Sequence, residues 1–125
     1  MNKSDIRKRI LKLRKKNYFD NAQFNFESII KVLKKRGYTK KIIGGYFPYN
    51  YEANIIPILE KFENLNYSLL LPKIGKNSQM NFFDWSVNDP LNINEYGIPE
   101  PITNKVKYPD VLLVPLVAYD KNFNR

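Results

Sequence analysis

An apolar run near the end of the sequence limits what this chain can fold into more than any other feature. Residues 111–118 have the sequence Val-Leu-Leu-Val-Pro-Leu-Val-Ala, and Asp120 is the first charged residue after them. A short continuous apolar run of this kind predicts a strand that is buried inside a sheet. In open α/β sheets, ligands bind just beyond the carboxyl ends of such strands. We therefore expect a binding site close to Asp120.

Patterns typical of helices and strands alternate along the rest of the chain. Apolar residues at helical spacing predict three helices, over residues 4–16, over residues 20–36 and from Asn54 onward. Apolar runs predict three further strands, over residues 41–47, 67–72 and 80–85. Residues 86–109, rich in Pro, Asn and Gly, are expected to be irregular. This alternation predicts a single α/β domain over residues 1–125, with three layers, an N-terminal helical pair and a mostly parallel sheet.

The sequence contains no cysteine and no histidine, which excludes several kinds of chemistry. Disulfides, the usual zinc sites and catalysis by Ser-His or Cys-His pairs are not available to these residues. Chemistry must rest on carboxylates, Lys, Arg, Tyr, the backbone or a metal bound through oxygen. No apolar segment approaches the ~20 residues of a membrane span, and no signal peptide is visible. We expect a cytoplasmic protein without a membrane partner.

Positive charge is concentrated in the first third of the chain. Residues 1–41 contain 14 Lys and Arg against three acidic residues, a net charge of +11, whereas residues 42–125 contain seven against nine, a net charge of −2. This asymmetry predicts an anionic partner, either nucleic acid or a small phosphorylated or carboxylated molecule. In the first predicted helix, Lys3, Arg7 and Arg14 fall within ~40° of one another. They flank an apolar stripe that we expect to be buried, so they are placed to reach a cleft, while the other basic residues face solvent.

Three residues are candidates for a site, and each also has an ordinary structural interpretation. Glu52 lies between a predicted strand and a predicted helix, on the side of the sheet where ligands bind, among three tyrosines that offer stacking surfaces; the alternative is an exposed loop glutamate. Tyr96, which precedes Gly97 in a proline-rich loop, either lines a pocket or covers a sheet edge. Asp120 either ligates Mg²⁺ or caps a turn with Asn122.

A series of short motifs follows in order along nearly the whole chain. They are Lys3-x-x-x-Arg7, Tyr46-x-Pro48-x-x-x-Glu52, Leu71-Pro72, Phe82-x-x-Trp85, Asp89-Pro90-Leu91, Tyr96-Gly97-Ile98-Pro99-Glu100-Pro101 and Pro109-Asp110-x-Leu112-x-x-Val114-Pro115-x-x-Ala118-Tyr119-Asp120. This ordered set resembles the 5-formyltetrahydrofolate cyclo-ligase family, also called methenyltetrahydrofolate synthetases. The Gly-Ile-Pro-Glu-Pro segment and the closing strand are the strongest part of the resemblance.

The resemblance implies an ATP- and Mg²⁺-dependent ring closure that converts 5-formyltetrahydrofolate to 5,10-methenyltetrahydrofolate. The formyl oxygen takes the γ-phosphoryl group of ATP, N10 of the folate attacks the activated carbon, and phosphate leaves. The resemblance also implies that Lys3, Arg7 and Arg125 contact ATP and that Glu52 and Tyr96 contact the folate. Such phosphoryl transfer needs positioned cations and Mg²⁺ more than a protein nucleophile, which agrees with the lack of His and Cys.

Members of this family continue from the pair seen here as Asn124-Arg125 into Leu-Gly-x-Gly-x-Gly-Tyr-Tyr-Asp-Arg, which supplies donors for phosphate, an aromatic for folate and an acid for the metal. A further strand and helix follow it. We therefore expect the C-terminal part of the family fold to be missing, because the sequence is a fragment, a second chain supplies the rest or the reading frame is broken. Alone, residues 1–125 are expected to have weak or no activity and to associate, whereas the complete protein is expected to be a monomer.

Two other functions stay open at this point. A small basic module that binds nucleic acid would explain the positive charge of residues 1–41, because cations bind the phosphate backbone, but it would not explain the proline-rich loop over residues 96–101. A remnant that binds folate or nucleotide without catalysis would explain the same motifs as the enzyme does. In the leading interpretation the partners are 5-formyltetrahydrofolate and ATP, without nucleic acid.

Overall fold

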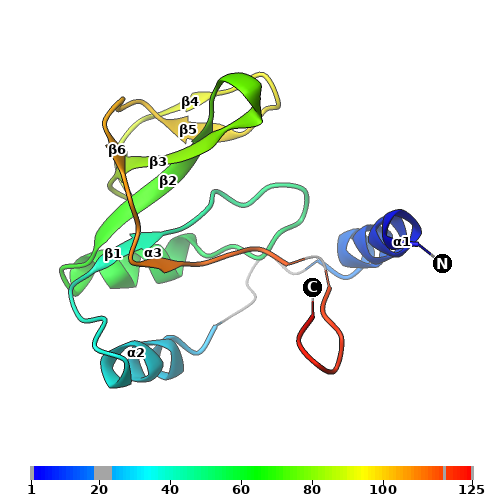
Figure 1. Ribbon diagram of the computed structural model, residues 1–125, viewed down its shortest axis with the longest axis horizontal. Coiled ribbons are helices and arrows are strands. Elements are labelled where there is room, and N and C mark those ends of the chain that lie inside the picture. Colours follow the sequence, from blue (N-terminus) through cyan, green and yellow to red (C-terminus); the bar gives the residue numbers. More distant parts are fainter. Residues whose placement is uncertain (1, 19–23, 117, 125) are drawn as a thin grey trace.

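The computed structural model describes residues 2–18, 24–116 and 118–124 (Figure 1). The helices in this part of the chain are α1 (Lys3–Lys16), α2 (Phe26–Lys35), α3 (Ile56–Asn64) and a single 3-10 turn, η1 (Lys76–Ser78). The strands are β1 (Ile42–Gly44), β2 (Ser68–Ile74), β3 (Met80–Trp85), β4 (Leu91–Ile93), β5 (Pro99–Pro101), β6 (Val106–Lys107) and β7 (Val111–Leu112). None of the helices described is both long and apolar enough to cross a membrane.

Five of these strands form one mixed sheet in the order β6-β3-β2-β1-β7. β1 pairs in parallel with β2 and with β7, whereas β3 pairs antiparallel with β2 and with β6. Four of the five strands therefore run in one direction, and β3 runs against them. The structure confirms the predicted α/β fold with a mostly parallel sheet, and β2 and β3 confirm the predicted strands over residues 67–72 and 80–85.

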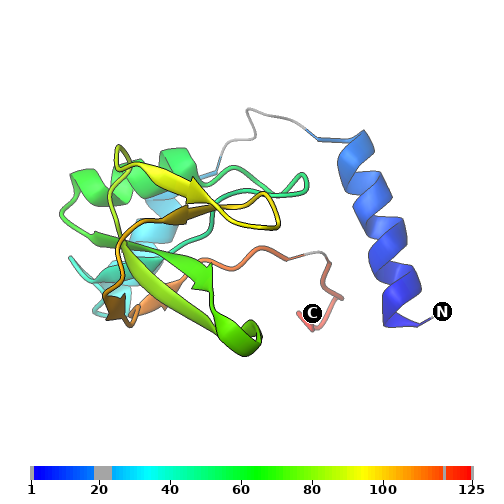
Figure 2. The same cartoon turned by 90° about the horizontal axis from the view of Figure 1, so that it is seen from above.

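The helices α2 and α3 pack together on one face of this sheet (Figures 1 and 2). Phe26 of α2 meets Phe62 of α3 edge to face, with 4.9 Å between the ring centroids. Ile43 of β1 and Leu69 of β2 belong to the same buried cluster, so the apolar stripes of both helices cover the sheet. The described residues thus supply the sheet and one helical layer of the three layers that we predicted.

The two packed helices begin in different ways, α2 at a side-chain cap and α3 without one. α2 begins later than predicted, because the side chain of Asn25 accepts a hydrogen bond from the Ser28 N–H at 3.1 Å and so caps the helix at this point. Residues 19–23 lie outside the described part of the chain. The N-cap of α3 is Ile55, which forms no side-chain cap hydrogen bond, and the side chain of Asn54, where we expected the helix to begin, accepts a hydrogen bond from the Ile56 N–H at 3.1 Å.

α1 lies beside the sheet rather than on it (Figure 2). None of its residues is buried, and the exposed fractions of Ile6 and Leu13 are 42% and 48%. The prediction of a buried stripe on this helix is therefore wrong for this structure. The N-cap is Asn2, whose side chain accepts a hydrogen bond from the Asp5 N–H at 2.9 Å, so the helix begins one residue before the predicted range.

The apolar run over residues 111–118 does not form the long buried strand that we predicted. β7 covers only Val111 and Leu112, and within the described residues it is an edge strand with β1 as its neighbour. Residues 113–116 continue past β1 without pairing as a strand, because Pro115 has no N–H to donate. Val114 is 49% exposed, and Val117 lies outside the described residues. β1 is also shorter than the predicted strand over residues 41–47.

The segment over residues 86–109 is more ordered than its composition predicted. β4 and β5 form a two-stranded antiparallel sheet, in which Leu91 pairs with Pro101 and Ile93 with Pro99. Proline is depleted in strands because it has no N–H to donate to the hydrogen bonds between strands. The two prolines of β5 are the reason that the sequence pattern did not predict this strand. The turn between the strands is closed by the Asn94 side chain, which accepts hydrogen bonds from two backbone N–H groups, 2.9 Å and 3.0 Å away.

Candidate functional site

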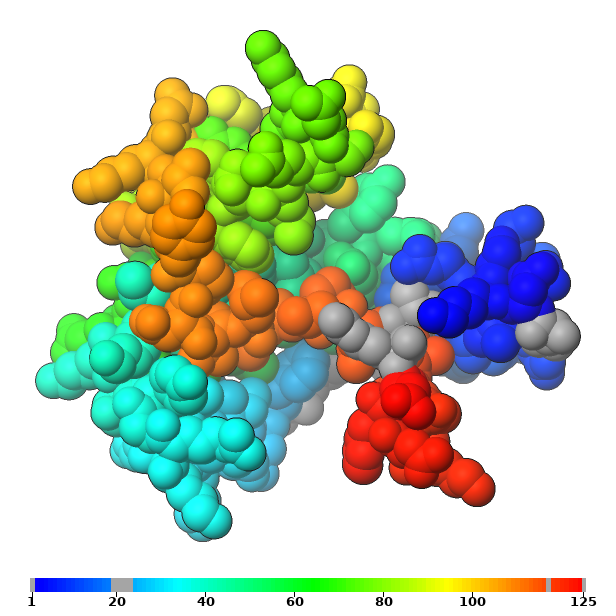
Figure 3. Space-filling view, viewed as in Figure 1, coloured from blue at the N-terminus to red at the C-terminus, as the bar shows by residue number. Residues whose placement is uncertain are grey.

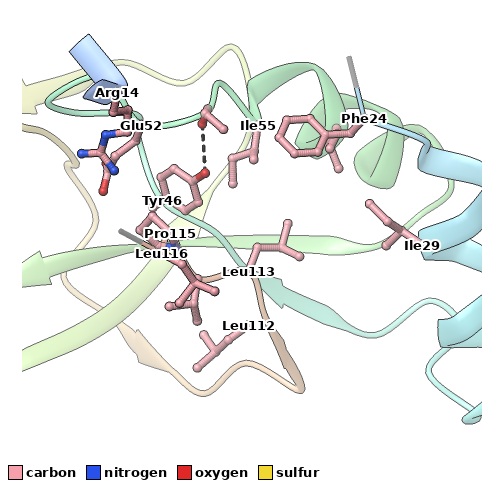
Figure 4. A pocket seen from close by; sticks show the side chains of 13 residues that line it. Arg14, Phe24, Ile29, Tyr46, Glu52, Ile55, Leu112, Leu113, Pro115 and Leu116 are labelled. Carbon is pink, nitrogen blue, oxygen red and sulfur yellow. Dashed lines mark hydrogen bonds between the residues drawn. The ribbon is translucent and has the colours of Figure 1, made fainter. Parts of the chain in front are cut away.

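A cavity of about 440 Å³ opens at the carboxyl end of β1 (Figure 4). Five parts of the chain line it: the end of α1, the segment 46–53 that follows β1, residues at or just before the start of α2, residues at or just before the start of α3, and residues 112–116. The cavity lies where parallel strands end and the chain turns toward a helix, which is the usual place for ligands in such sheets. This is the end of the sheet at which we predicted a site.

Most of the cavity lining is apolar. Residues 112–116 form one wall, Ile55 and Phe24 lie opposite it, and Ile29 lies at one end (Figure 4). Apolar walls with a few converging polar groups are typical of cavities that bind small molecules. The cavity is therefore suited to a partly apolar small molecule with a few polar groups.

Glu52 supplies the carboxylate of the cavity. It is half-buried, and its Oε1 accepts a hydrogen bond from the Tyr49 N–H at 2.9 Å. Burial raises the pKa of the Glu52 carboxyl, while the Tyr49 N–H and the positive charge of Arg14 act in the opposite direction. A partly desolvated carboxylate forms stronger hydrogen bonds with a ligand than an exposed one does, because water competes less.

Tyr46 and Arg14 are the other side chains with polar groups that line the cavity. The Tyr46 hydroxyl donates a hydrogen bond to the Ala53 carbonyl oxygen at 2.9 Å, and burial followed by the charge of Glu52 raises the pKa of Tyr46 to about 12. Tyr46 is thus neutral at physiological pH. Arg14 is half-buried, and its Nη2 donates a hydrogen bond to the Asn50 carbonyl oxygen at 2.7 Å.

The sequence placed Arg14 on the same helix face as Lys3 and Arg7 but did not single it out as a site residue. In the structure Arg14 lines the cavity, whereas Lys3 and Arg7 are exposed on α1 and do not line it. The sequence contained a signal that could have identified Arg14. It shares a helix face with Lys3 and Arg7, and of these three residues it is the closest in sequence to the rest of the domain. Lys15, which we expected to face solvent, lies with its Nζ 5.8 Å from the centroid of the Tyr51 ring.

The remaining predicted site residues lie away from the cavity or outside the described residues. Tyr96 is 58% exposed at the tip of the β4–β5 hairpin and does not line the cavity. Arg125 is outside the described residues. Asp120 closes a turn, because its carboxylate accepts hydrogen bonds from the Asn122 N–H, at 2.8 Å, and from Asn124. These bonds, those from Asn124 above all, lower the pKa of Asp120.

Comparisons with known proteins place this geometry in a family. The model of the 5-formyltetrahydrofolate cyclo-ligase family matches residues 1–125. The NMR structure of 5,10-methenyltetrahydrofolate synthetase from Aquifex aeolicus is similar, with a TM-score of 0.67 and 25% identity, over 96% of this chain and 63% of that one. The chain thus spans less than two thirds of the length of that protein.

A second solved structure, the 5,10-methenyltetrahydrofolate synthetase from Mycoplasma pneumoniae, has the same fold with a TM-score of 0.63 and 18% identity, over 97% of this chain and 68% of that one. No curated protein sequence matches the chain. The family match extends over all 125 residues, and the arrangement of strands and helices agrees with the two solved synthetases. The chain belongs to the 5-formyltetrahydrofolate cyclo-ligase family.

Proposed function

We propose that this chain binds 5-formyltetrahydrofolate in the cavity beside β1 and carries the folate-binding part of a 5-formyltetrahydrofolate cyclo-ligase. The observation that carries the proposal is the half-buried Glu52 carboxylate in an apolar cavity at the carboxyl end of β1, in a chain of this family. The reaction is the ATP-dependent conversion of 5-formyltetrahydrofolate to 5,10-methenyltetrahydrofolate.

The cavity matches the chemistry of a reduced pterin ring. Such a ring is flat and has N–H groups along one edge, for which a carboxylate is a strong acceptor. Glu52 uses Oε1 for the Tyr49 N–H, and its Oε2 receives no hydrogen bond from the described residues. The apolar wall formed by residues 112–116 would cover one face of the ring. In this proposal Tyr96 contacts the folate from the β4–β5 hairpin, where its exposed ring is available for stacking.

In the proposed reaction the formyl oxygen attacks the γ-phosphorus of ATP, and ADP leaves. N10 of the folate then attacks the activated carbon, and the phosphate leaves as the ring closes. The protein's part is to hold the two substrates in line and to balance the phosphate charge, which dominates catalysis of phosphoryl transfer. Lys3 and Arg7 are the proposed phosphate contacts. They lie on the same face of α1 as Arg14, which donates a hydrogen bond to the Asn50 carbonyl oxygen.

The family chemistry also implies Mg²⁺, and the described residues do not form a site that fits it. No group of three or more His, Cys, Asp or Glu side chains within residues 2–18, 24–116 and 118–124 could hold a metal ion. The Asp120 carboxylate oxygens are occupied by hydrogen bonds within their own turn. We therefore assign no Mg²⁺ ligand to these residues and derive no step through the metal.

Calorimetric titration of the 125-residue polypeptide with 5-formyltetrahydrofolate tests the proposed function. Loss of a hydrogen bond to a charged acceptor costs about 1.5–3 kcal/mol, so Glu52→Gln should weaken binding by about 10- to 150-fold. Glu60→Gln is the matched control, because Glu60 is exposed on α3 and does not line the cavity. Equal affinities of the Glu52→Gln variant and the control would refute this site.

One observation supports a second function, which is binding of nucleic acid. α1 has no buried residue, and all of its basic side chains except Arg14 are exposed. A polyanion bound by these side chains would dissociate steeply as salt is raised. Binding of a labelled single-stranded RNA that persists at 0.2 M salt would favour this function over the folate site, whereas binding only at low salt would indicate unspecific attraction.

A further inference from the structure

α1 contacts the rest of the domain through its last residues, and these contacts converge on one turn. The Arg14 Nη2 donates to the Asn50 carbonyl oxygen at 2.7 Å. The ring of Tyr18, just after the helix, meets the ring of Tyr51 edge to face, with 5.5 Å between the centroids. Lys15 lies over the same Tyr51 ring. No residue of α1 is fully buried, although Ile10 and Leu11 are partly covered, so these contacts help to fix its position against the body.

The turn that receives these contacts has an unusual backbone. Asn50 and Tyr51 have φ angles of 51° and 63°, in the left-handed region that an aromatic residue rarely adopts. Residues held in this region cost energy and persist where the surrounding structure imposes them, commonly at functional sites. Two hydrogen bonds close the turn, from the Glu52 N–H to the Tyr49 carbonyl oxygen at 3.1 Å and from the Tyr49 N–H to Glu52 Oε1 at 2.9 Å.

The strained turn and the carboxylate of the cavity are therefore one unit, and Arg14 binds the turn and lies near the carboxylate. Its Nη2 holds the Asn50 carbonyl oxygen, and its charge acts on the Glu52 carboxyl. Its Nε is buried without a hydrogen-bond partner among the described residues. No ion pair joins Arg14 to Glu52 among the residues described, so the interaction acts across a short gap at one end of the cavity (Figure 4).

Few other charges face Glu52. Tyr46, from the segment after β1, is neutral because its pKa is raised to about 12. The parts of α2 and α3 that line the cavity are apolar, and so is the wall formed by residues 112–116. Lys15 lies beyond the Tyr51 ring and does not line the cavity. Arg14 is thus the positive charge of the described cavity lining.

We propose that Arg14 is a positioning residue, which holds the 49–52 turn against α1 and sets the orientation and charge of the Glu52 carboxylate in the cavity. Arg14 acts through Glu52 and makes no contact with the ligand itself. The proposal deepens the proposed function, on which it rests for the identity of the ligand. Its structural part, the dependence of Glu52 on Arg14, holds with or without a folate.

The first experiment measures this dependence without a ligand. The pKa of Glu52 is measured by NMR from the ¹³C shift of its carboxyl group in the wild-type chain and in Arg14→Met, Arg14→Lys and Arg9→Met. Arg9 is exposed on the same helix, so Arg9→Met removes an equal charge away from the cavity. We expect the pKa of Glu52 to rise in Arg14→Met and to keep its wild-type value in Arg9→Met and Arg14→Lys.

An unchanged pKa of Glu52 in Arg14→Met, or an equal rise in Arg9→Met, would overturn the proposal. Arg14→Lys keeps the charge with a single donor group, so a pKa in this variant as high as that of Arg14→Met would also overturn it. The amide signals of residues 50–52 report the turn, and they should shift in Arg14→Met and stay in place in Arg9→Met.

The second experiment measures 5-formyltetrahydrofolate affinity from pH 5 to pH 8. A carboxylate that accepts hydrogen bonds from the ligand loses affinity as the pH falls through its pKa, and Arg14→Met should move this loss to higher pH. A loss by one constant factor at every pH would show that Arg14 contacts the ligand directly, which contradicts a positioning role. Absence of wild-type binding at every pH would refute the proposed function, and the carboxyl titration would then decide the inference alone.

Discussion

At the scale of single residues, the burial of Glu52 has a consequence for stability that can be measured. Burial raises the pKa of this carboxyl above its ordinary 4.5. A carboxyl with a raised pKa in the folded state stabilises the fold below its unfolded-state pKa, and this contribution is lost as the pH rises through the folded-state pKa. Near neutral pH, Glu52 is therefore held in the cavity at a cost to stability, which is common at binding sites.

We expect Glu52→Gln to raise the melting temperature at pH 7 and to lose this advantage at pH 4. The amide is neutral at both pH values, and its Oε1 is still able to accept the Tyr49 N–H. Thermal unfolding followed by circular dichroism checks this, with Glu60→Gln as the exposed control. A Glu52→Gln variant that is less stable than the wild type at pH 7 would contradict the assignment of a desolvated carboxylate.

The position of Glu52 could be predicted from the sequence because it depends on local order: a strand, a short segment and a helix place it at the carboxyl end of β1. The role of Arg14 could not, because its hydrogen bond to Asn50 joins residues 36 positions apart. For Asp120 the sequence left two alternatives, a Mg²⁺ ligand or the cap of a turn with Asn122. The structure shows the hydrogen bond from the Asn122 N–H to Asp120 that the turn requires.

At the scale of elements, the close approach of β1 and β7 depends on Gly44. A Cβ at this position would lie 2.7 Å from Leu112 Cδ2 and 3.0 Å from Pro109 Cβ. The leucine side chain is able to rotate away, but the proline ring is fixed to its backbone. At Gly75, a Cβ would meet only the Gln79 carbonyl oxygen, at an ordinary 3.5 Å.

We therefore expect Gly44→Ala to lower the free energy of unfolding by about 1–3 kcal/mol, as overpacking does. Gly75→Ala, the matched control, should change it by less than about 0.5 kcal/mol. Urea unfolding followed by the fluorescence of Trp85, the one tryptophan of the sequence, measures both. Equal midpoints for Gly44→Ala and the wild type would show that β7 does not pack tightly against β1.

α1 should be the least protected helix of the domain. Its 14 residues bury no side chain, and an isolated helix of this length is marginal in water. We expect amide hydrogens of α1 to exchange at least about tenfold faster than those of β2, which lies inside the sheet. Equal protection of α1 and β2 would mean that α1 is packed more firmly than its contacts indicate.

The sequence predicted the helices and strands whose apolar pattern is enough to determine their structure locally. The apolar stripe of α2 and the apolar residues of β2 belong to one buried cluster, to which β3 contributes Trp85. The stripe of α1 has the same spacing, yet it is exposed, because amphipathicity states which face is suited to burial and not whether a partner is present. The run over residues 111–118 is apolar throughout, but Pro115 limits its pairing.

At the scale of the whole molecule, the site is assembled from parts that are distant in sequence: residue 14, the segment 46–53 and residues 112–116. α1 and residues 118–124 stand out from the body on the same side of the molecule (Figure 3). The sheet with α2 and α3 forms the body, and the cavity lies between this body, the end of α1 and residues 112–116. The site is therefore more sensitive to α1 than the fold is.

We expect residues 1–125 alone to bind the folate without catalysing ring closure at an ordinary rate. The Gly-rich motif of the family is not part of these 125 residues, and loss of even one preorganised donor can cost ~10²–10³-fold in rate. The assay is the absorbance of 5,10-methenyltetrahydrofolate formed from 5-formyltetrahydrofolate, ATP and Mg²⁺. Turnover near ~1 s⁻¹, within the ordinary range of enzymes, would contradict this expectation.

The most direct measurement is an NMR titration of the ¹⁵N-labelled chain with 5-formyltetrahydrofolate, in which each backbone amide reports whether the ligand is near. The account predicts saturable shifts for Tyr46, Glu52 and Leu113, which line the cavity, and little change in β3 or in the outer face of α2. It also predicts that Glu52→Gln needs about 10- to 150-fold more ligand for the same shifts and that Glu60→Gln responds as the wild type does. Saturable shifts that map to another surface, or none at millimolar ligand, would contradict it.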